Sequence, residues 1–131
     1  MAGKKRRIGE VVSRATARFL PVGPRKIRFV ADLIRGMTVA EAQTKLSLIH
    51  RPSAVPLLQR LLKSAVANSE RTDAEELVIG RIWADGGPML KRWRPRAFGR
   101  PNPIRKRFCH VTIELTESVK AGSPRSASRE V

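Results

Sequence analysis

The stretch that decides the fold of this chain is residues 86–113, GGPMLKRWRPRAFGRPNPIRKRFCHVTI. It holds eight Lys or Arg and no Asp or Glu, and Trp93 and Phe98 stand among the basic residues. So much like charge repels itself unless a polyanion neutralises it. Aromatic rings between arginines also suit stacking on bases. The stretch therefore predicts a nucleic-acid-binding element, with RNA favoured.

Strand-like sequence lies on both sides of this stretch, in residues 77–85 and 104–115. In the second segment the apolar residues Cys109, Val111, Ile113 and Leu115 alternate with His110, Thr112 and Glu114. This period of two predicts one buried face and one wet face. The connection between the segments is far longer than an ordinary hairpin loop. We therefore predict a long two-stranded arm over residues 84–110, which turns near 97–99 and needs a partner to order it.

One further strand and three helices are predicted before this arm. Residues 13–20 alternate in the pattern of a half-buried strand. Pro24 opens a first helix that Gly36 stops. Thr38 and Glu41 form a capping-box pattern for a second helix that runs through about residue 48. Ser53 is the predicted cap of the third and longest helix, whose buried face is Leu58, Leu61, Leu62, Ala65 and Val66.

Composition places the chain among basic, single-domain proteins. The 131 residues carry a net charge of +16, and the sequence pI is about 11.7, well above the ~9 that marks nucleic-acid-binding domains. No apolar run approaches the ~20 residues that cross a bilayer, so no membrane partner is expected. One cysteine, Cys109, allows no internal disulfide. We expect a cytoplasmic protein, although an Arg-rich start poor in acidic residues also suits an organelle transit peptide.

The basic residues concentrate in two places, residues 1–28 and residues 86–113, which hold 17 of the 27. Two separate basic surfaces predict a large polyanion that the protein contacts in two places. The candidate RNA-binding residues are Lys4, Lys5, Arg6, Arg7, Arg14, Arg18, Arg25, Lys26, Arg28, Lys91, Arg92, Trp93, Arg94, Arg96, Phe98, Arg100, Arg105, Lys106, Arg107 and His110. For residues 4–7 the alternative is a tail that only improves solubility, and for His110 it is simple exposure.

The sequence contains no residue pattern typical of a catalytic site or a metal site. Adjacent residues of a strand point to opposite faces, so Cys109 and His110 cannot form a nucleophile and base. One Cys and two His fall short of any zinc spacing. Trp83 lies in a strand pattern and is expected in the core. We expect no enzyme activity, no cofactor and no metal.

Three motifs together resemble the family of the twenty-second protein of the bacterial large ribosomal subunit. They are RKIRFVADLIRG at residues 25–36, LKSAVANS at 62–69, and KRWRPRAFGR at 91–100 with IRKR at 104–107. The resemblance covers residues 13–117 in order. The segment Pro101-Asn102-Pro103 departs from the usual family pattern. Because proline removes a backbone donor, we expect the returning strand to start only near Ile104.

The resemblance implies an α+β fold, with three helices packed on a small antiparallel sheet and one long protruding β-hairpin. It implies a single domain over residues 13–117 and does not extend to the two ends of the chain, where composition predicts a basic flexible extension (1–12) and a disordered tail (118–131). It also implies a structural component of the large subunit that binds 23S-type rRNA near the opening of the peptide exit tunnel. The implied tunnel-lining tip is Leu90, Lys91, Arg92, Trp93, Arg94, Pro95, Arg96, Ala97, Phe98, Gly99 and Arg100.

The implied partners are large-subunit rRNA, other large-subunit proteins and the nascent polypeptide, with no homo-oligomer. An arm ordered by RNA also suggests a role in subunit assembly. The alternative function is a DNA-architectural protein, which would prefer duplex DNA and self-associate. An RNA-processing enzyme is a third possibility, but it needs a catalytic constellation that the sequence lacks.

Overall fold

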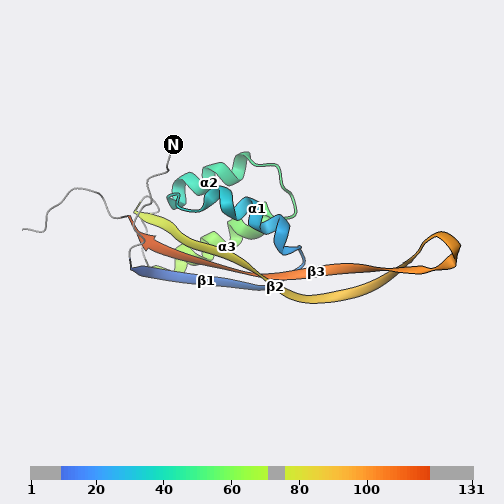
Figure 1. The fold of residues 1–131 in the computed structure, drawn as a ribbon. Helices are drawn as coiled ribbons and strands as arrows, with labels where there is room; N and C mark the ends of the chain where they lie inside the picture. The colour runs from blue at the N-terminus through green and yellow to red at the C-terminus, as the bar shows by residue number, and fades with distance from the viewer. Residues whose placement is uncertain (1–9, 71–75, 119–131) are drawn as a thin grey trace, which may run out of the picture.

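The computed structural model describes residues 10–70 and 76–118, in which three helices lie on one face of a three-stranded antiparallel sheet (Figure 1). The strands are β1 (Val11–Leu20), β2 (Leu77–Pro95) and β3 (Pro101–Glu117), in the order β1-β3-β2. The helices are α1 (Pro24–Ile34), α2 (Val39–Leu48) and α3 (Val55–Asn68). This arrangement confirms the predicted α+β class.

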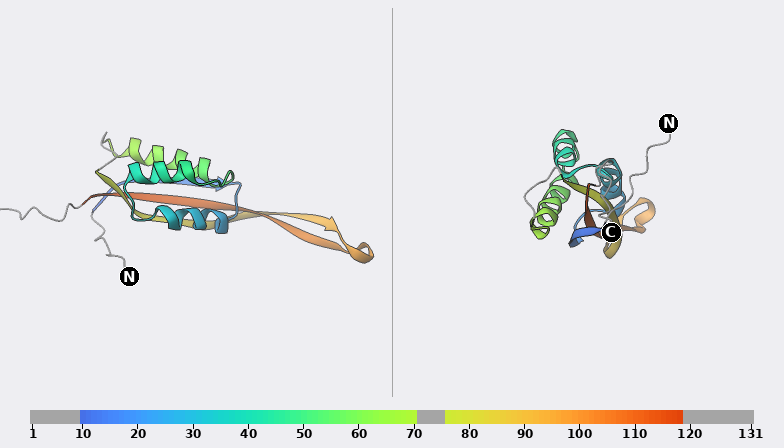
Figure 2. Two further views of the ribbon diagram at one scale, coloured as in Figure 1. Left: turned by 90° about the horizontal axis from the view of Figure 1, so that it is seen from above. Right: turned by 90° about the vertical axis from the view of Figure 1, so that its left-hand side faces the viewer.

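Strands β2 and β3 pair along nearly their whole length, from Leu77 opposite Glu117 to Pro95 opposite Pro101. The half near the helices belongs to the body, and the other half runs past them as a two-stranded ribbon (Figures 1 and 2). A short 3₁₀ turn, η1 (Ala97–Gly99), closes the ribbon with Phe98 at φ 59° and Gly99 at φ 66°. The predicted arm and the position of its turn are confirmed.

The prediction that β3 starts near Ile104 is wrong, because the prolines do not interrupt the ladder. The Arg96 N–H donates to the Arg100 carbonyl at 3.0 Å, which makes these two residues a hydrogen-bonded pair. Such pairs alternate along an antiparallel ladder with pairs whose backbone N–H groups point outward. Pro101 and Pro103, opposite Pro95 and Trp93, fall on the outward positions. A proline at such a position has no backbone N–H but removes no hydrogen bond from the ladder.

The hydrophobic core lies between the helices and the inner face of the sheet. The four apolar β3 residues Cys109, Val111, Ile113 and Leu115 are fully buried, as predicted. They belong to one cluster with residues from all three helices, including Ile27, Leu46 and Leu62. Burial raises the pKa of the Cys109 thiol above its usual value, and the positive charge of Arg28 acts in the opposite direction. Cys109 is therefore a core residue that stays protonated at neutral pH.

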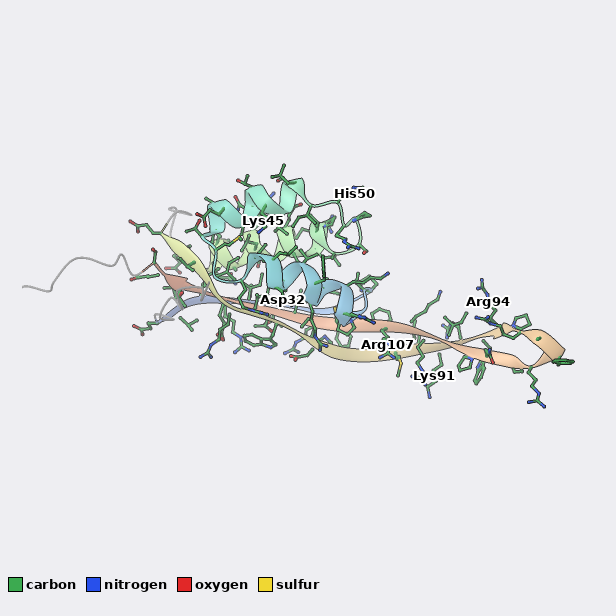
Figure 3. The ribbon with its side chains drawn as sticks, turned by 45° about the horizontal axis from the view of Figure 1, so that its top comes forward. Asp32, Lys45, His50, Lys91, Arg94 and Arg107 are labelled. Carbon is green, nitrogen blue, oxygen red and sulfur yellow. The ribbon has the colours of Figure 1, made fainter. Side chains whose placement is uncertain are left out.

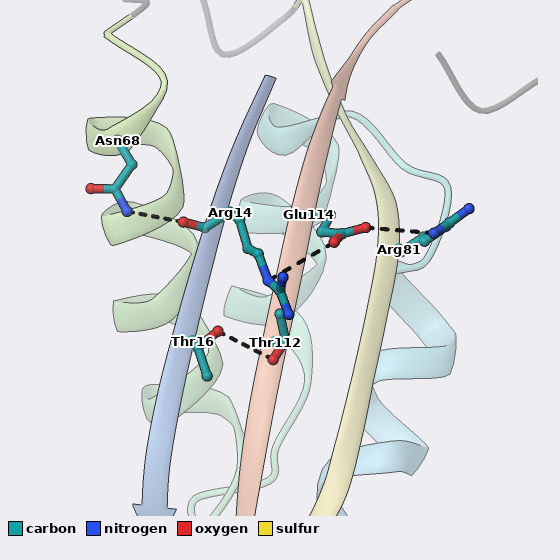
Figure 4. A network of polar contacts seen from close by, with 6 residues as sticks. All are labelled: Arg14, Thr16, Asn68, Arg81, Thr112 and Glu114. Atoms are coloured by element: carbon teal, nitrogen blue, oxygen red, sulfur yellow. Dashed lines mark hydrogen bonds and ion pairs between the residues drawn. The ribbon is translucent and has the colours of Figure 1, made fainter. Parts of the chain in front are cut away.

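The outer face of β3 is not wet, which corrects the prediction made from its alternating pattern. Thr112, Glu114 and Thr116 are all buried. Because β3 is the central strand, side chains from both neighbours cover it (Figure 4). Glu114 lies between Arg14 of β1 and Arg81 of β2, with N···O distances of 3.9 and 4.0 Å.

Trp83 is also not in the core, where it was expected. It is half-buried on the outer face of the sheet, and the guanidinium of Arg14 lies 5.6 Å from the centre of its ring. This outer face carries no helix among the described residues (Figure 2). The face is therefore a largely polar layer rather than a second core.

The helix ends follow the predicted signals except at α3. The Thr38 hydroxyl accepts from the Glu41 N–H, and the Glu41 carboxylate accepts from the Thr38 N–H, which confirms the capping box. Gly36, at φ 78°, follows the end of α1. Helix α3 is capped at Ala54, not at Ser53. The Arg51 carbonyl already accepts from the N–H groups of residues 54 and 55, so no side-chain cap is needed.

Strand β1 begins at Val11, two residues before the predicted start. The segment 1–9 and the tail 119–131 lie outside the described residues, as do the predicted binding residues Lys4, Lys5, Arg6 and Arg7. No described helix is long and apolar enough to cross a membrane.

Shortening the arm is expected to leave the body folded. In the variant, residues 91–105 are replaced by Asn-Gly, a two-residue turn that joins the paired residues Leu90 and Lys106. All residues from 88 to 107 are exposed, so the deletion removes no core contact. We expect the free energy of unfolding to change by no more than ~0.5 kcal/mol, measured by thermal melting in circular dichroism.

The matched comparison is Leu62→Ala, which truncates a fully buried α3 side chain and should cost about 2–5 kcal/mol. Loss of cooperative melting in the shortened variant would show that the arm contributes to the core.

Candidate nucleic-acid interface

The arm carries positive charge on both of its faces. From residue 89 to the turn and back to 107 the pairing has no bulge, so side chains alternate regularly between the faces. One face carries Lys91, Arg105 and Arg107, and the other carries Arg92, Arg94, Arg96, Arg100 and Lys106. Figure 3 shows Lys91 and Arg94 on opposite sides of the ribbon. A ligand that neutralises all eight charges has to surround the arm.

The aromatic and apolar side chains of the arm are exposed between these charges. Trp93 is 65% exposed, and Phe98 at the tip is 100% exposed. Leu90 and Ile104 lie across the ladder from Lys106 and Arg92 respectively, whereas Trp93 lies opposite Pro103 and Pro95 opposite Pro101, so the one apolar patch of the ribbon is a short one near the tip. An isolated two-stranded ribbon is only marginally stable in water. The exposed rings are available to stack on bases or to pack between RNA segments.

Helix α1 is held against the outer edge of β2 by two arginines. The Arg28 guanidinium donates twice to the Ala84 carbonyl, at 2.9 and 3.2 Å, and Arg35 donates to the Ile82 carbonyl at 2.9 Å. These bonds satisfy carbonyls that an edge strand would otherwise leave unpaired. Arg28 was predicted to bind RNA, and it also holds α1 against β2.

The two basic segments of the sequence meet where the arm leaves the body. An open hollow of about 420 Å³ has Lys26 of α1 and residues 21–23 on one side. Its other side is formed by the arm residues Arg105, Lys106 and Arg107, together with Leu90 and Phe108. Lys26 and these three arm cations are about 80 residues apart in the chain. The structure thus joins two predicted surfaces into one, at the arm–body junction.

A second open hollow of about 440 Å³ also has Lys26 and Ser53 in its lining, and so lies next to the first. Arg25 and Arg28, which are among the predicted RNA-binding residues, also line it, whereas Phe29 and Arg51 were not predicted as binding residues. No pattern in the sequence links Arg51, in the loop between α2 and α3, to α1. Phe29 could have been identified as a candidate from the sequence, because it is an aromatic residue outside the apolar stripe of its helix.

The other predicted residues of the body, Arg14, Arg18 and His110, line neither hollow. Arg14 is engaged with Trp83 and Glu114 on the outer face of the sheet, and Arg18 is exposed near the end of β1. His110 is half-buried: its Nδ1 accepts from the Phe19 N–H at 3.0 Å, and its ring meets Phe19 edge-on at 4.9 Å. His110 is therefore not simply exposed, and RNA contact by this residue remains a prediction.

Within residues 10–70 and 76–118, no group of three or more His, Cys, Asp or Glu side chains could hold a metal ion. Cys109 is fully buried on the inner face of β3, and His110 lies on the outer face. The chemistry that the described surface offers is therefore charge neutralisation, hydrogen-bond donation and stacking.

Comparison with known proteins gives two findings. The model of the family "Ribosomal protein L22p/L17e" matches residues 15–116. The chain is also 48% identical over 108 residues to a protein of Pediococcus pentosaceus named "Large ribosomal subunit protein uL22". That similarity covers 80% of this chain and 91% of the relative.

Binding to folded RNA should fall steeply with salt, and the junction should contribute to the slope. Each neutralised phosphate adds ~0.7–0.9 to the log–log slope, so contact by half of the arm's cations gives a magnitude of about 3. Arg107→Gln, in the junction hollow, should lower this magnitude by about 0.7–0.9. The measurement is filter binding between ~50 and 200 mM salt.

Lys63→Gln is the matched control, because Lys63 is an exposed α3 cation that lines neither hollow. A wild-type slope near zero, or equal effects of the two variants, would contradict this assignment of the interface.

Proposed function

The chain belongs to the ribosomal protein L22p/L17e family, and from this premise we propose that it is a structural constituent of the large ribosomal subunit that binds 23S-type rRNA. The arm enters the folded rRNA, and its tip, residues 90–100, forms part of the wall of the peptide exit tunnel. The body stays near the tunnel opening. The partners are rRNA, neighbouring large-subunit proteins and the nascent polypeptide, in the ribosomes of the cytoplasm, and the protein has no catalytic role.

The observation that carries this proposal is the arm itself. The ribbon beyond Gly86 carries eight cations and no acidic residue, and all its side chains from 88 to 107 are exposed. About ten residues of β2 at ~3.3 Å each extend it roughly 30 Å past the helices. A narrow positive ribbon of this length suits a passage between RNA segments, whose phosphates would surround it. Phosphate contacts then position the protein, and the shape of the folded RNA determines where it binds.

The tip has the features of a surface that faces a cavity rather than a core. Phe98 is fully exposed and adopts a left-handed backbone conformation, at φ 59°. Such a conformation costs a non-glycine residue about 1 kcal/mol and persists only where the surrounding structure requires it. In this proposal the turn directs the ring of Phe98 toward the tunnel, where it can contact passing polypeptide.

Assembly follows from the same physics. Because none of the ribbon side chains from 88 to 107 is buried, RNA binding supplies the free energy that orders the ribbon. An arm that touches several RNA segments then holds those segments together. The DNA-architectural alternative is not retained, since the family match points to ribosomal proteins.

The first test is association with the ribosome. We expect the full chain to sediment with the large subunit and to remain there after a high-salt wash, because an arm enclosed by RNA cannot dissociate without opening the RNA fold. The variant with residues 91–105 replaced by Asn-Gly should be released by the same wash. Release of the wild-type chain, or its presence only in free fractions, would refute the proposal.

The second test concerns the tip. A photoreactive benzoylphenylalanine in place of Phe98 should cross-link to nascent chains in stalled ribosome complexes. The same residue in place of Phe19, which is 61% exposed on the body, is the control and should give no nascent-chain product. Equal yields at both positions would argue against a tunnel-lining tip.

A further inference from the structure

Helix α1 exposes an aromatic ring that its own packing does not need. The buried face of this helix is formed by Ile27, Val30, Ala31 and Ile34. Phe29 lies outside that face and is 55% exposed. Water in contact with so large an apolar side chain is unfavourable, so covering the ring with a ligand is favourable.

The ring already has a cationic neighbour. The guanidinium carbon of Arg51, from the loop before α3, lies 5.0 Å from the centre of the Phe29 ring. A planar guanidinium at this distance gains a cation–π interaction, and it can also stack on a second flat group. The pair joins two segments of the body and borders the hollow next to the arm–body junction.

The charge around this hollow is strongly one-sided. Arg25, Lys26, Arg28 and Arg51 line it, and Asp32 is its one acidic residue. The Asp32 carboxylate is already paired with Arg35 at 2.7 Å. The hollow therefore attracts an anion that also offers a flat, apolar or π-bonded face. A nucleotide has both features, in its phosphate and in its base.

The geometry of α1 makes this site rigid before any ligand arrives. Arg28 is fixed to the Ala84 carbonyl by two hydrogen bonds, and Arg35 is fixed to the Ile82 carbonyl. Phe29 lies between them on the same helix. A stacking surface on a rigid element loses little conformational freedom on binding. The hollow, at about 440 Å³, lies within the ~300–1,000 Å³ range of small-ligand sites.

We propose that this hollow binds an unpaired rRNA nucleotide, whose base stacks on the Phe29 ring and the Arg51 guanidinium while Arg25 and Lys26 hold its phosphate. This inference rests on the proposed function, since it names one nucleotide contact of the same RNA-binding protein. It adds a base-stacking contact on the body to the phosphate contacts of the arm. Stacking tolerates different bases, so the site selects an unstacked nucleotide by its conformation rather than by its sequence.

The test compares variants of the full chain in binding to a large-subunit rRNA transcript. Removal of a stacking side chain weakens single-strand binding by roughly 5- to 150-fold. We expect Phe29→Ala to weaken binding within that range with an unchanged salt slope, because no phosphate contact is lost. Phe29→Trp should restore the affinity, and Arg51→Lys, which keeps the charge but loses the planar group, should weaken binding at the same slope.

Leu48→Ala is the matched control. Leu48 is an apolar α2 residue, 81% exposed, that lines neither hollow. Phe29 is mostly exposed, so the variants should fold, and circular-dichroism melting checks this. Wild-type affinity in Phe29→Ala, an effect equal to that of Leu48→Ala, or no recovery in Phe29→Trp would overturn the stacking site.

Two further outcomes separate this inference from its premise. If Phe29→Ala binds like the wild type and both keep a steep salt dependence, the stacking site fails but RNA binding stands. If the wild-type chain does not bind the transcript, the proposed function fails and the inference fails with it. A competition assay tests the nucleotide against an acidic peptide. If polyglutamate displaces the Phe29-dependent binding as effectively as single-stranded RNA does, the ligand of the hollow is an acidic peptide and the nucleotide proposal is overturned.

Discussion

Pairing of β2 with β3 along almost their whole length is the constraint on which the rest of this structure depends. The same ladder passes from a body with a buried core into a ribbon with no buried face. In the body, the alternation of Cys109, Val111, Ile113 and Leu115 sets the register, because a slip of one residue would turn them toward the outer face. The ladder carries that register outward, with a shift at the irregularity between Gly86 and Met89. Core packing and this irregularity together therefore determine which arm residues face each other about 30 Å away.

The attachment of α1 to the edge of β2 is the second organising contact. Arg28 and Arg35 satisfy carbonyls of the edge strand, and in doing so they hold the helix beside the base of the arm. This placement brings Lys26 and Arg107 into the lining of one hollow at the arm–body junction. It also gives Arg28 two tasks, one in the fold and one in the positive surface. Arg28 is consequently a poor probe of RNA binding, whereas the side chains of Lys26 and Arg107 make no hydrogen bond or ion pair within residues 10–70 and 76–118.

The wrong predictions share a cause. The pattern along one segment does not show which other segments pack against it in the fold. Thr112 and Glu114 have the spacing of an exposed face, but β3 is the central strand and Arg14, Arg81 and their neighbours cover it. Pro101 and Pro103 look like strand breakers, but the register places both where a ladder bond is not made. Ser53 is a good cap by residue type, yet the carbonyl of Arg51 had already satisfied the first donors.

Much of this protein was determined by the sequence alone. Its apolar periodicity specified the three helices and the strands, because burial of one face is a local requirement. The run of cations with no acidic residue specified a strongly positive arm, because charge is additive along a chain. Only the tertiary structure decided which distant residues meet. The order β1-β3-β2 buried Glu114, and the packing of α1 on β2 placed Phe29 and Arg51 in one positive hollow. Such contacts depend on how elements pack in space, which spacing along the chain does not encode.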